Sequence, residues 1–88
     1  MKSRTVTVNC EQGLHLLIAS QVAKIAMRCG GTVQIRSQGQ VFVNACDAME
    51  VMTLGAAVGT PLEITADGTD ETSVLRDLIE LIEMGAAV

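Results

Sequence analysis

The only histidine of the chain, His15, stands in the run Gly13-Leu14-His15-Leu16-Leu17, between a strand-like and a helix-like stretch. A neutral imidazole offers a nucleophilic ring nitrogen near neutral pH. The N-terminus of a helix presents unpaired backbone N–H groups and about half a positive charge, so it attracts anions such as phosphate. A phosphoryl group carried on His15 would meet those N–H groups. A solvated or helix-capping histidine is the other interpretation of this position.

The composition indicates one small cytoplasmic domain over residues 1–88. Six basic and ten acidic residues give a formal charge of −4, which disfavours nucleic-acid binding. Three cysteines without a close pair, with a single histidine, make a poor metal site, so we expect reduced thiols and no metal or other cofactor. We expect no signal peptide and no membrane span, because no stretch is long and apolar enough.

The spacing of apolar residues predicts the elements that must position His15. Alternation predicts strands at 4–8, 32–36, 41–45 and 60–66, with a hairpin turn at 37–40. Helical spacing predicts a helix at about 16–28, a short one at 47–54, and a last one that Thr69 caps and Gly85 ends. Leu17 falls on the polar face of the first helix. The residues expected in the core are Val6, Val8, Ala19, Val22, Ala23, Ala26, Met27, Val33, Ile35, Val41, Val43, Ala45, Leu62, Ile64, Ala66, Val74, Leu75, Leu78, Leu81 and Ile82.

This order of elements predicts an α+β fold of two layers, a four-stranded sheet with helices on one face. The other face is expected to be wet, with Phe42 pointing outward from the third strand. The polar residues expected on that open face are Thr5, Thr7, Gln34, Arg36, Glu63 and Thr65.

The element order and three motifs together resemble the HPr family, the histidine-containing phosphocarriers of the bacterial phosphoenolpyruvate-dependent phosphotransferase system. The resemblance covers nearly the whole chain. Gly13-Leu14-His15 and Ala19 match the family's GLHARPA signature. The second and third motifs are matched by Met49, Val51, Met52, Thr53, Leu54 and Gly55, and by Gly59, Gly68, Asp70 and Glu71.

The resemblance implies an open-faced βαββαβα sandwich with an antiparallel sheet, and a carrier that is not itself an enzyme. His15 would accept a phosphoryl group from an enzyme I-type donor and pass it to an enzyme IIA-type acceptor. The ring nitrogen facing the helix N-terminus would hold the group, and the backbone N–H groups of Leu16 and Leu17 would receive its oxygens. The resemblance also implies an apolar docking patch for partners, formed by Ala48, Met49 and Met52. In this chain we expect Leu16, Leu17 and Ile18 to extend that patch into a continuous apolar docking surface around the histidine.

Two departures from the signature beside the histidine bear on phosphate transfer. Leu17 stands where the family has Arg, and Ile18 where it has Pro. The arginine normally donates a charged hydrogen bond to the phosphate, and losing one such contact can cost orders of magnitude in transfer rate. Ile18 can take the geometry of the first turn at small cost. We therefore expect phosphorylation to survive and fast transfer to be impaired.

Asp47 stands where Gram-positive members of the family carry a regulatory serine, and its carboxylate cannot be phosphorylated by that route. Two interpretations compete. As an N-cap of the short helix, Asp47 would contribute about 1 kcal/mol. As a mimic of phosphoserine it would be partial, because it carries one charge instead of nearly two.

Two functions remain open on these residues. The first is the phosphoryl carrier. The second is a non-carrier module that binds a regulatory protein through the surface around His15, Met49 and Met52; the missing arginine and Asp47 favour it, and the retained histidine opposes it. A stand-alone enzyme is disfavoured, because no second acid or base and no metal set accompanies His15 in the sequence.

Overall fold

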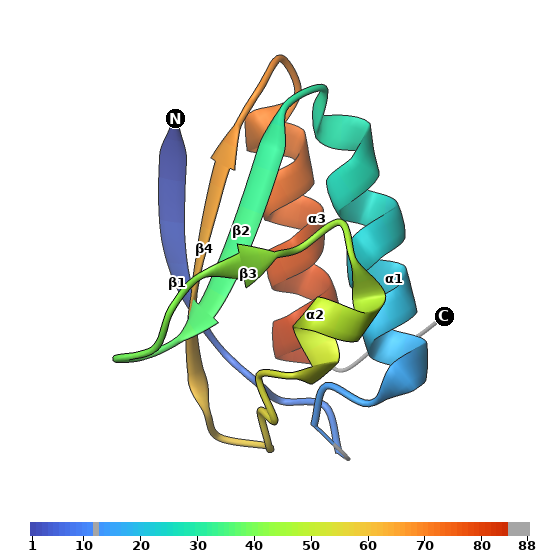
Figure 1. Cartoon of the computed structure of the whole chain (residues 1–88), viewed down its shortest axis with the longest axis vertical. Helices are drawn as coiled ribbons and strands as arrows, with labels where there is room; N and C mark the ends of the chain where they lie inside the picture. The colour runs from blue at the N-terminus through green and yellow to red at the C-terminus, as the bar shows by residue number, and fades with distance from the viewer. Residues whose placement is uncertain (12, 85–88) are drawn as a thin grey trace.

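Strands and helices form two layers in the computed structural model, which describes residues 1–11 and 13–84 (Figure 1). The strands are β1 (Lys2–Thr7), β2 (Thr32–Ser37), β3 (Val43–Asn44) and β4 (Pro61–Asp67). The helices are α1 (Leu16–Ala26), the 3₁₀ turn η1 (Met27–Cys29), α2 (Ala48–Met52) and α3 (Glu71–Met84). The strands form one antiparallel sheet in the order β1-β4-β2-β3, and the helices cover one of its faces. This confirms the predicted α+β sandwich.

The core lies between the helices and the inward face of the sheet. Its strand residues alternate along the chain, as Val33, Ile35, Leu62, Ile64 and Ala66 show. The helical stripes of α1 and α3 close it from the other side, and every residue of the predicted stripe of α3 is buried. Because the core side chains are aliphatic, burial of apolar surface is the main force that holds the two layers together.

Met27 is exposed, so its predicted place in the core was wrong. The α-helix ends at Ala26, and Met27 begins η1. A 3₁₀ turn has three residues per turn, so it rotates its side chains away from the stripe that an α-helix would continue. Gly30 then ends the turn with a φ of +75°, a conformation that glycine adopts readily.

The strand that follows the hairpin turn is shorter than predicted. The turn itself forms, with the N–H of Gln40 donating to the carbonyl oxygen of Ser37 at 3.0 Å. The ladder with β2 begins only at Val43, and Val41 is 84 % exposed, so its predicted inward position was wrong. The neighbouring Phe42 points outward as predicted and lies under the guanidinium of Arg36, whose central carbon is 4.4 Å from the ring centroid. This cation–π contact holds the Phe42 side chain on the open face of the sheet, next to Val43, where pairing with β2 begins.

The open face of the sheet is polar, as predicted. Arg36 and Glu63 pair across β2 and β4, with 2.6 Å between the guanidinium and the carboxylate. The hydrogen bond from Arg36 holds the pKa of Glu63 below its ordinary value of 4.5. Thr5 is the partner of Glu63 on β1, so polar side chains continue to the edge of the sheet.

The start of α3 is not capped by Thr69, so that prediction was wrong. The helix begins at Glu71, and the Thr69 hydroxyl donates to the carbonyl oxygen of Cys29 at 3.5 Å. Glu71 holds this end, because its N–H donates to the carbonyl oxygen of Gly68 and its carboxylate accepts from the Gly68 N–H. The predicted helix end at Gly85 lies outside the described residues. Among the helices described, none has the length and apolar character needed to cross a membrane.

Candidate functional site

His15 immediately precedes the first residue of α1 and has an extended backbone, with φ −78° and ψ 178°. Its carbonyl oxygen accepts the N–H of Ala19 at 2.8 Å, which is the first hydrogen bond of the helix. Its side chain makes no capping hydrogen bond and is partly exposed. The interpretation of His15 as a side-chain cap is therefore wrong, and its imidazole is free of that role.

The loop before His15 is held in place by the segment that follows α2. The N–H of Leu14 donates to the carbonyl oxygen of Ala56 at 3.0 Å, and the Leu14 side chain is buried. Gly13 has a φ of +73°, and a Cβ there would overlap the Ala56 carbonyl oxygen and lie 3.0 Å from the Cα of Ala57. Only glycine both adopts this φ readily and leaves room for the Ala56 carbonyl oxygen. The role of Ala56 was missed from the sequence, because a backbone contact over this separation leaves no pattern in it.

A second set of contacts ties β1 and α3 to the same loop. The N–H of Val8 donates to the carbonyl oxygen of Thr60 at 2.9 Å. The N–H of Asn9 donates to the carbonyl oxygen of Ile82 at 3.0 Å, so the chain leaves β1 against the last turn of α3. Long-range backbone hydrogen bonds to Thr60 and Ile82 thus hold the start of the segment that leads from β1 to His15.

The first turn of α1 presents backbone N–H groups beside apolar side chains. A helix's first amides have no acceptor within the helix, and here no acidic side chain occupies the first turn. Leu17 is 55 % exposed, which confirms its predicted place on the outer face of the helix. The only basic residue of α1, Lys24, lies in the last turn. An anion at this end would meet the helix dipole and backbone N–H groups, without a cation from α1.

Ile18 is only 1 % exposed, so its predicted place on the docking surface was wrong. It precedes Val22 by four positions and Ala26 by eight, and all three belong to the buried stripe of α1. Neighbouring residues point in different directions from a helix, so Ile18 is buried while Leu17 is exposed. The apolar residues that remain exposed or half-exposed near the start of α1 and on α2 are called the apolar patch, and they are Leu16, Leu17, Ala48, Met49 and Met52.

α2 carries the second half of the apolar patch and packs beside α1 (Figure 1). Met49 is 69 % exposed, and Met52 is also exposed, whereas Val51 between them is buried. Ala48 is half-buried against the core. The buried Val51 anchors the short helix and directs the two methionines outward. Methionine side chains adapt their shape to a contacting surface, which suits a docking role.

Asp47 caps α2, as one of the two interpretations predicted. Its carboxylate oxygen Oδ1 accepts the N–H groups of Met49 at 2.9 Å and Glu50 at 3.4 Å. Glu50 does not complete a reciprocal capping box, because its carboxylate accepts the N–H of Asn44 at 3.1 Å. The N–H of Asp47 donates instead to the carbonyl oxygen of Asn44. The cap therefore ties α2 to the end of β3.

The cysteines do not compete with His15 as nucleophiles. Cys10 and Cys29 are buried and Cys46 is half-buried, and all three are free thiols. Burial raises the pKa of the Cys10 thiol, and burial together with the nearby Cys29 raises the pKa of Cys46. Both remain protonated at neutral pH, and the thiol is a poorer nucleophile than the thiolate. In the described part of the chain no group of three or more His, Cys, Asp or Glu side chains is arranged to hold a metal.

Comparison with known proteins identifies this arrangement. The sequence profile described as "PTS HPr component phosphorylation site" matches residues 2–84. The phosphocarrier protein HPr of Haemophilus influenzae is 33 % identical over 82 residues, which cover 93 % of this chain and 95 % of that protein. The crystal structure of HPr-C-His from Thermoanaerobacter tengcongensis superposes with a TM-score of 0.87 at 28 % identity, covering 97 % of this chain and 94 % of that one. A phosphocarrier protein HPr from Bacillus anthracis gives a TM-score of 0.84 at 27 % identity, covering 92 % and 95 % of the two chains. The chain belongs to the HPr family of phosphocarrier proteins of the phosphotransferase system.

Proposed function

We propose that this chain carries a phosphoryl group on His15, which it accepts from an enzyme I-type donor and passes to an enzyme IIA-type acceptor in the cytoplasm. The observation that carries the proposal is the position of His15. Its partly exposed imidazole is not used as a cap and stands at the N-terminus of an 11-residue helix. A phosphoryl group on the ring nitrogen facing α1 would lie against the positive end of that helix.

The transfer requires only one bond to form and one to break. The lone pair of the neutral His15 nitrogen attacks phosphorus, and the bond from phosphorus to the donor breaks, with its electron pair returning to the donor. The backbone N–H groups of Leu16 and Leu17 donate to the phosphate oxygens. Each favourable interaction of an anion with an exposed helix end contributes about 0.3–1 kcal/mol. Without an acceptor the chain holds one phosphoryl group and has no turnover of its own.

Leu17 changes how charge is stabilised during transfer. An arginine at this position would supply a charged hydrogen bond to the phosphate. Leu17 supplies none, so the helix dipole, the backbone N–H groups and the partner must carry that charge. Transfer is therefore expected to be slower than in a carrier with arginine at this position.

The apolar patch is the proposed docking surface for both partners. More than half of the surface of both Met49 and Leu17 is exposed and therefore open to a partner. Burying the patch against a partner would exclude water from the phosphoryl group while it moves between proteins. Ile18 takes no part in this docking surface, because it lies in the core.

Asp47 is proposed as a structural cap at the position where a serine would be regulated. Its carboxylate accepts two backbone N–H groups, which is the role of an N-cap. Because a carboxylate is not a substrate for a kinase that phosphorylates a hydroxyl, this position cannot switch by that modification. The carrier would then lack regulation at the start of α2.

The test is phosphorylation by phosphoenolpyruvate and a competent enzyme I, followed by intact mass before and after brief acid treatment. We expect one adduct per chain that acid removes, because the P–N bond breaks when the ring is protonated. His15→Ala should give no adduct. A carrier that the same enzyme I labels serves as the positive control.

Absence of an adduct on folded protein, while the control carrier is labelled, would overturn the carrier. The non-carrier interaction module would then be the better account. Pull-down with Met49→Gln as the comparison would identify whether its partner uses the apolar patch.

A further inference from the structure

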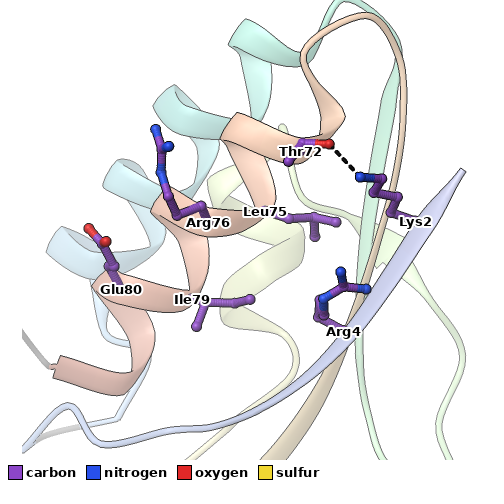
Figure 2. A pocket seen from close by; sticks show the side chains of 7 residues that line it. All are labelled: Lys2, Arg4, Thr72, Leu75, Arg76, Ile79 and Glu80. Atoms are coloured by element: carbon purple, nitrogen blue, oxygen red, sulfur yellow. Dashed lines mark hydrogen bonds between the residues drawn. The ribbon is translucent and has the colours of Figure 1, made fainter.

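A cavity of about 270 Å³ opens between the edge strand β1 and helix α3 (Figure 2). Lys2 and Arg4 line it from β1. Five residues at helical spacing line it from α3, namely Thr72, Leu75, Arg76, Ile79 and Glu80. No residue of the His15 loop or of α2 lines it, so it is separate from the proposed phosphoryl site.

Lys2 and Arg4 occupy positions of β1 that face the helices. Lys2 pairs with Ala66 and Arg4 with Ile64, and both partners are buried under the helices. Paired residues of antiparallel strands lie on the same face of the sheet. Val6, the next inward residue of β1, is buried in the core. The chain thus places two cations where the pattern of the strand calls for apolar side chains.

The two cations are held by neutral groups. The ammonium of Lys2 donates to the Thr72 hydroxyl oxygen at 2.7 Å, and the guanidinium of Arg4 donates to the carbonyl oxygen of Ser3 at 2.7 Å. Within residues 1–11 and 13–84, the ion pairs of the structure include no carboxylate partner for either. Arg28 and Arg36, by contrast, are each paired with a carboxylate.

The floor of the cavity is apolar and its two ends differ in charge. Leu75 and Ile79 point from α3 toward Lys2 and Arg4, as Figure 2 shows. Arg76 and Glu80 leave the helix on its outer side, and Arg76 is engaged with Asp77 at 3.4 Å. The carboxylate of Glu80 repels an anion at the far rim. An anionic group is therefore favoured at the end formed by Lys2, Arg4 and Thr72.

We propose that this cavity binds a small organic anion, in which a carboxylate or phosphate group is attached to a compact apolar body. The apolar body would contact mainly Ile79, which is partly exposed, because Leu75 is only 3 % exposed. The anionic group would accept from Lys2, from Arg4 and from the Thr72 hydroxyl, whose hydrogen is available because its oxygen accepts from Lys2. The volume lies just below the range of about 300–1,000 Å³ for drug-sized ligands, so the ligand is small.

Protection of the sheet edge is the competing explanation for inward-facing charges on β1. Charged side chains on an edge strand oppose pairing with another sheet. That explanation requires the charges alone and predicts no saturable ligand binding. A ligand titration therefore distinguishes the two explanations.

The test is a two-dimensional amide NMR titration of the full chain with phenyl phosphate and with benzoate, two anions with the same apolar body. We expect saturable shifts at residues 2–4 and 72–80. Benzyl alcohol, which lacks the charge, and inorganic phosphate, which lacks the apolar body, should each bind at least about fivefold more weakly. Stronger binding of either phenyl phosphate or benzoate identifies the preferred anionic group. His15→Ala should leave these shifts unchanged, which keeps this result independent of the carrier function.

Arg4→Gln should weaken binding of the better anion by about fivefold. Lys24→Gln, which removes the same charge from an exposed site on α1, should not. Lys2→Gln provides a second variant should Arg4→Gln fail to fold. The proposal is overturned if neither anion gives saturable shifts at these residues, or if the β1 variants bind as well as Lys24→Gln.

Discussion

The backbone N–H of Leu14 donates to the carbonyl oxygen of Ala56 at 3.0 Å, and this bond ties the loop before His15 to the segment after α2. Gly13 permits the contact, because it has a φ of +73° and no Cβ to meet Ala56. The position of the His15 backbone at the start of α1 therefore depends on a contact with a residue far along the chain. His15 is positioned by packing as much as by its place in the sequence.

Gly13→Ala should destabilise the protein more than Gly39→Ala does. Both glycines have positive φ, but a Cβ at Gly39 meets nothing within 4 Å. Gly39→Ala measures backbone strain alone, about 1 kcal/mol. Gly13→Ala adds the collision with Ala56, for a total above about 2 kcal/mol. Urea unfolding gives both values, and equal losses for the two variants would contradict the role of the Ala56 contact.

Asp47→Ala should lower the free energy of unfolding by about 1 kcal/mol, because two backbone N–H groups of α2 lose their acceptor. Asp47→Ser keeps an acceptor oxygen and should stay within a few tenths of a kcal/mol of the parent. Urea unfolding at neutral pH measures both. If Asp47→Ser lowered the free energy of unfolding as much as Asp47→Ala, the helix would be stabilised by the charge of Asp47 and not by its hydrogen bonds.

Leu17→Arg should raise the rate of phosphoryl transfer at least about tenfold, because it restores a cation beside the helix end. The measurement is rapid-quench transfer from phosphorylated enzyme I. Gln21→Arg is the matched control, since it adds the same charge one turn further along α1, beyond the reach of a charge at the first turn. Equal acceleration by both variants would point to general attraction between the proteins.

Asp77 should make stability depend on pH in the acid range. Its hydrogen bond from Arg28, aided by Arg76, holds its pKa below the ordinary value of 3.8. A carboxyl with a lowered folded pKa stabilises the fold above its unfolded pKa and loses that contribution as pH falls through the folded value. Asp77→Asn should therefore be less stable than the parent at neutral pH, with the difference shrinking below pH 3.8. Unfolding curves measured at several acidic pH values test this expectation. A stability difference between the parent and Asp77→Asn that did not change with pH would contradict the lowered pKa of Asp77.

Met49→Gln should weaken binding to the phosphoryl donor by about fivefold, while leaving the free energy of unfolding nearly unchanged. Met49 is largely exposed, so the change removes apolar contact area from a partner and not from the core. Val41→Gln is the control, because Val41 is also exposed and apolar but lies outside the apolar patch. Calorimetric titration compares the three proteins, and a similar loss with Val41→Gln would rule out a localised docking surface.

Local patterns in the sequence correctly predicted the features that depend on residues close together in the chain. Alternation placed Val33 and Ile35 in the core, because successive side chains of a strand must face opposite sides. The cap at Asp47 depends on residues two and three positions away, so it could be predicted from composition and spacing. Leu17 was placed on the outer face of α1 by the period of the helix alone.

Only the tertiary structure decided the features that depend on segments far apart in the chain. The Thr69 hydroxyl donates to the carbonyl oxygen of Cys29, a residue far away in the chain, instead of capping the helix that follows it. The pairing of β1 with β4 turned Lys2 and Arg4 toward α3 and created the cavity between them. The sequence by itself determined the order of the strands and α-helices, the residue that could carry a phosphoryl group, and the family to which the chain belongs. Which surfaces meet was decided by packing, because backbone hydrogen bonds and apolar burial between distant segments leave no local pattern to read.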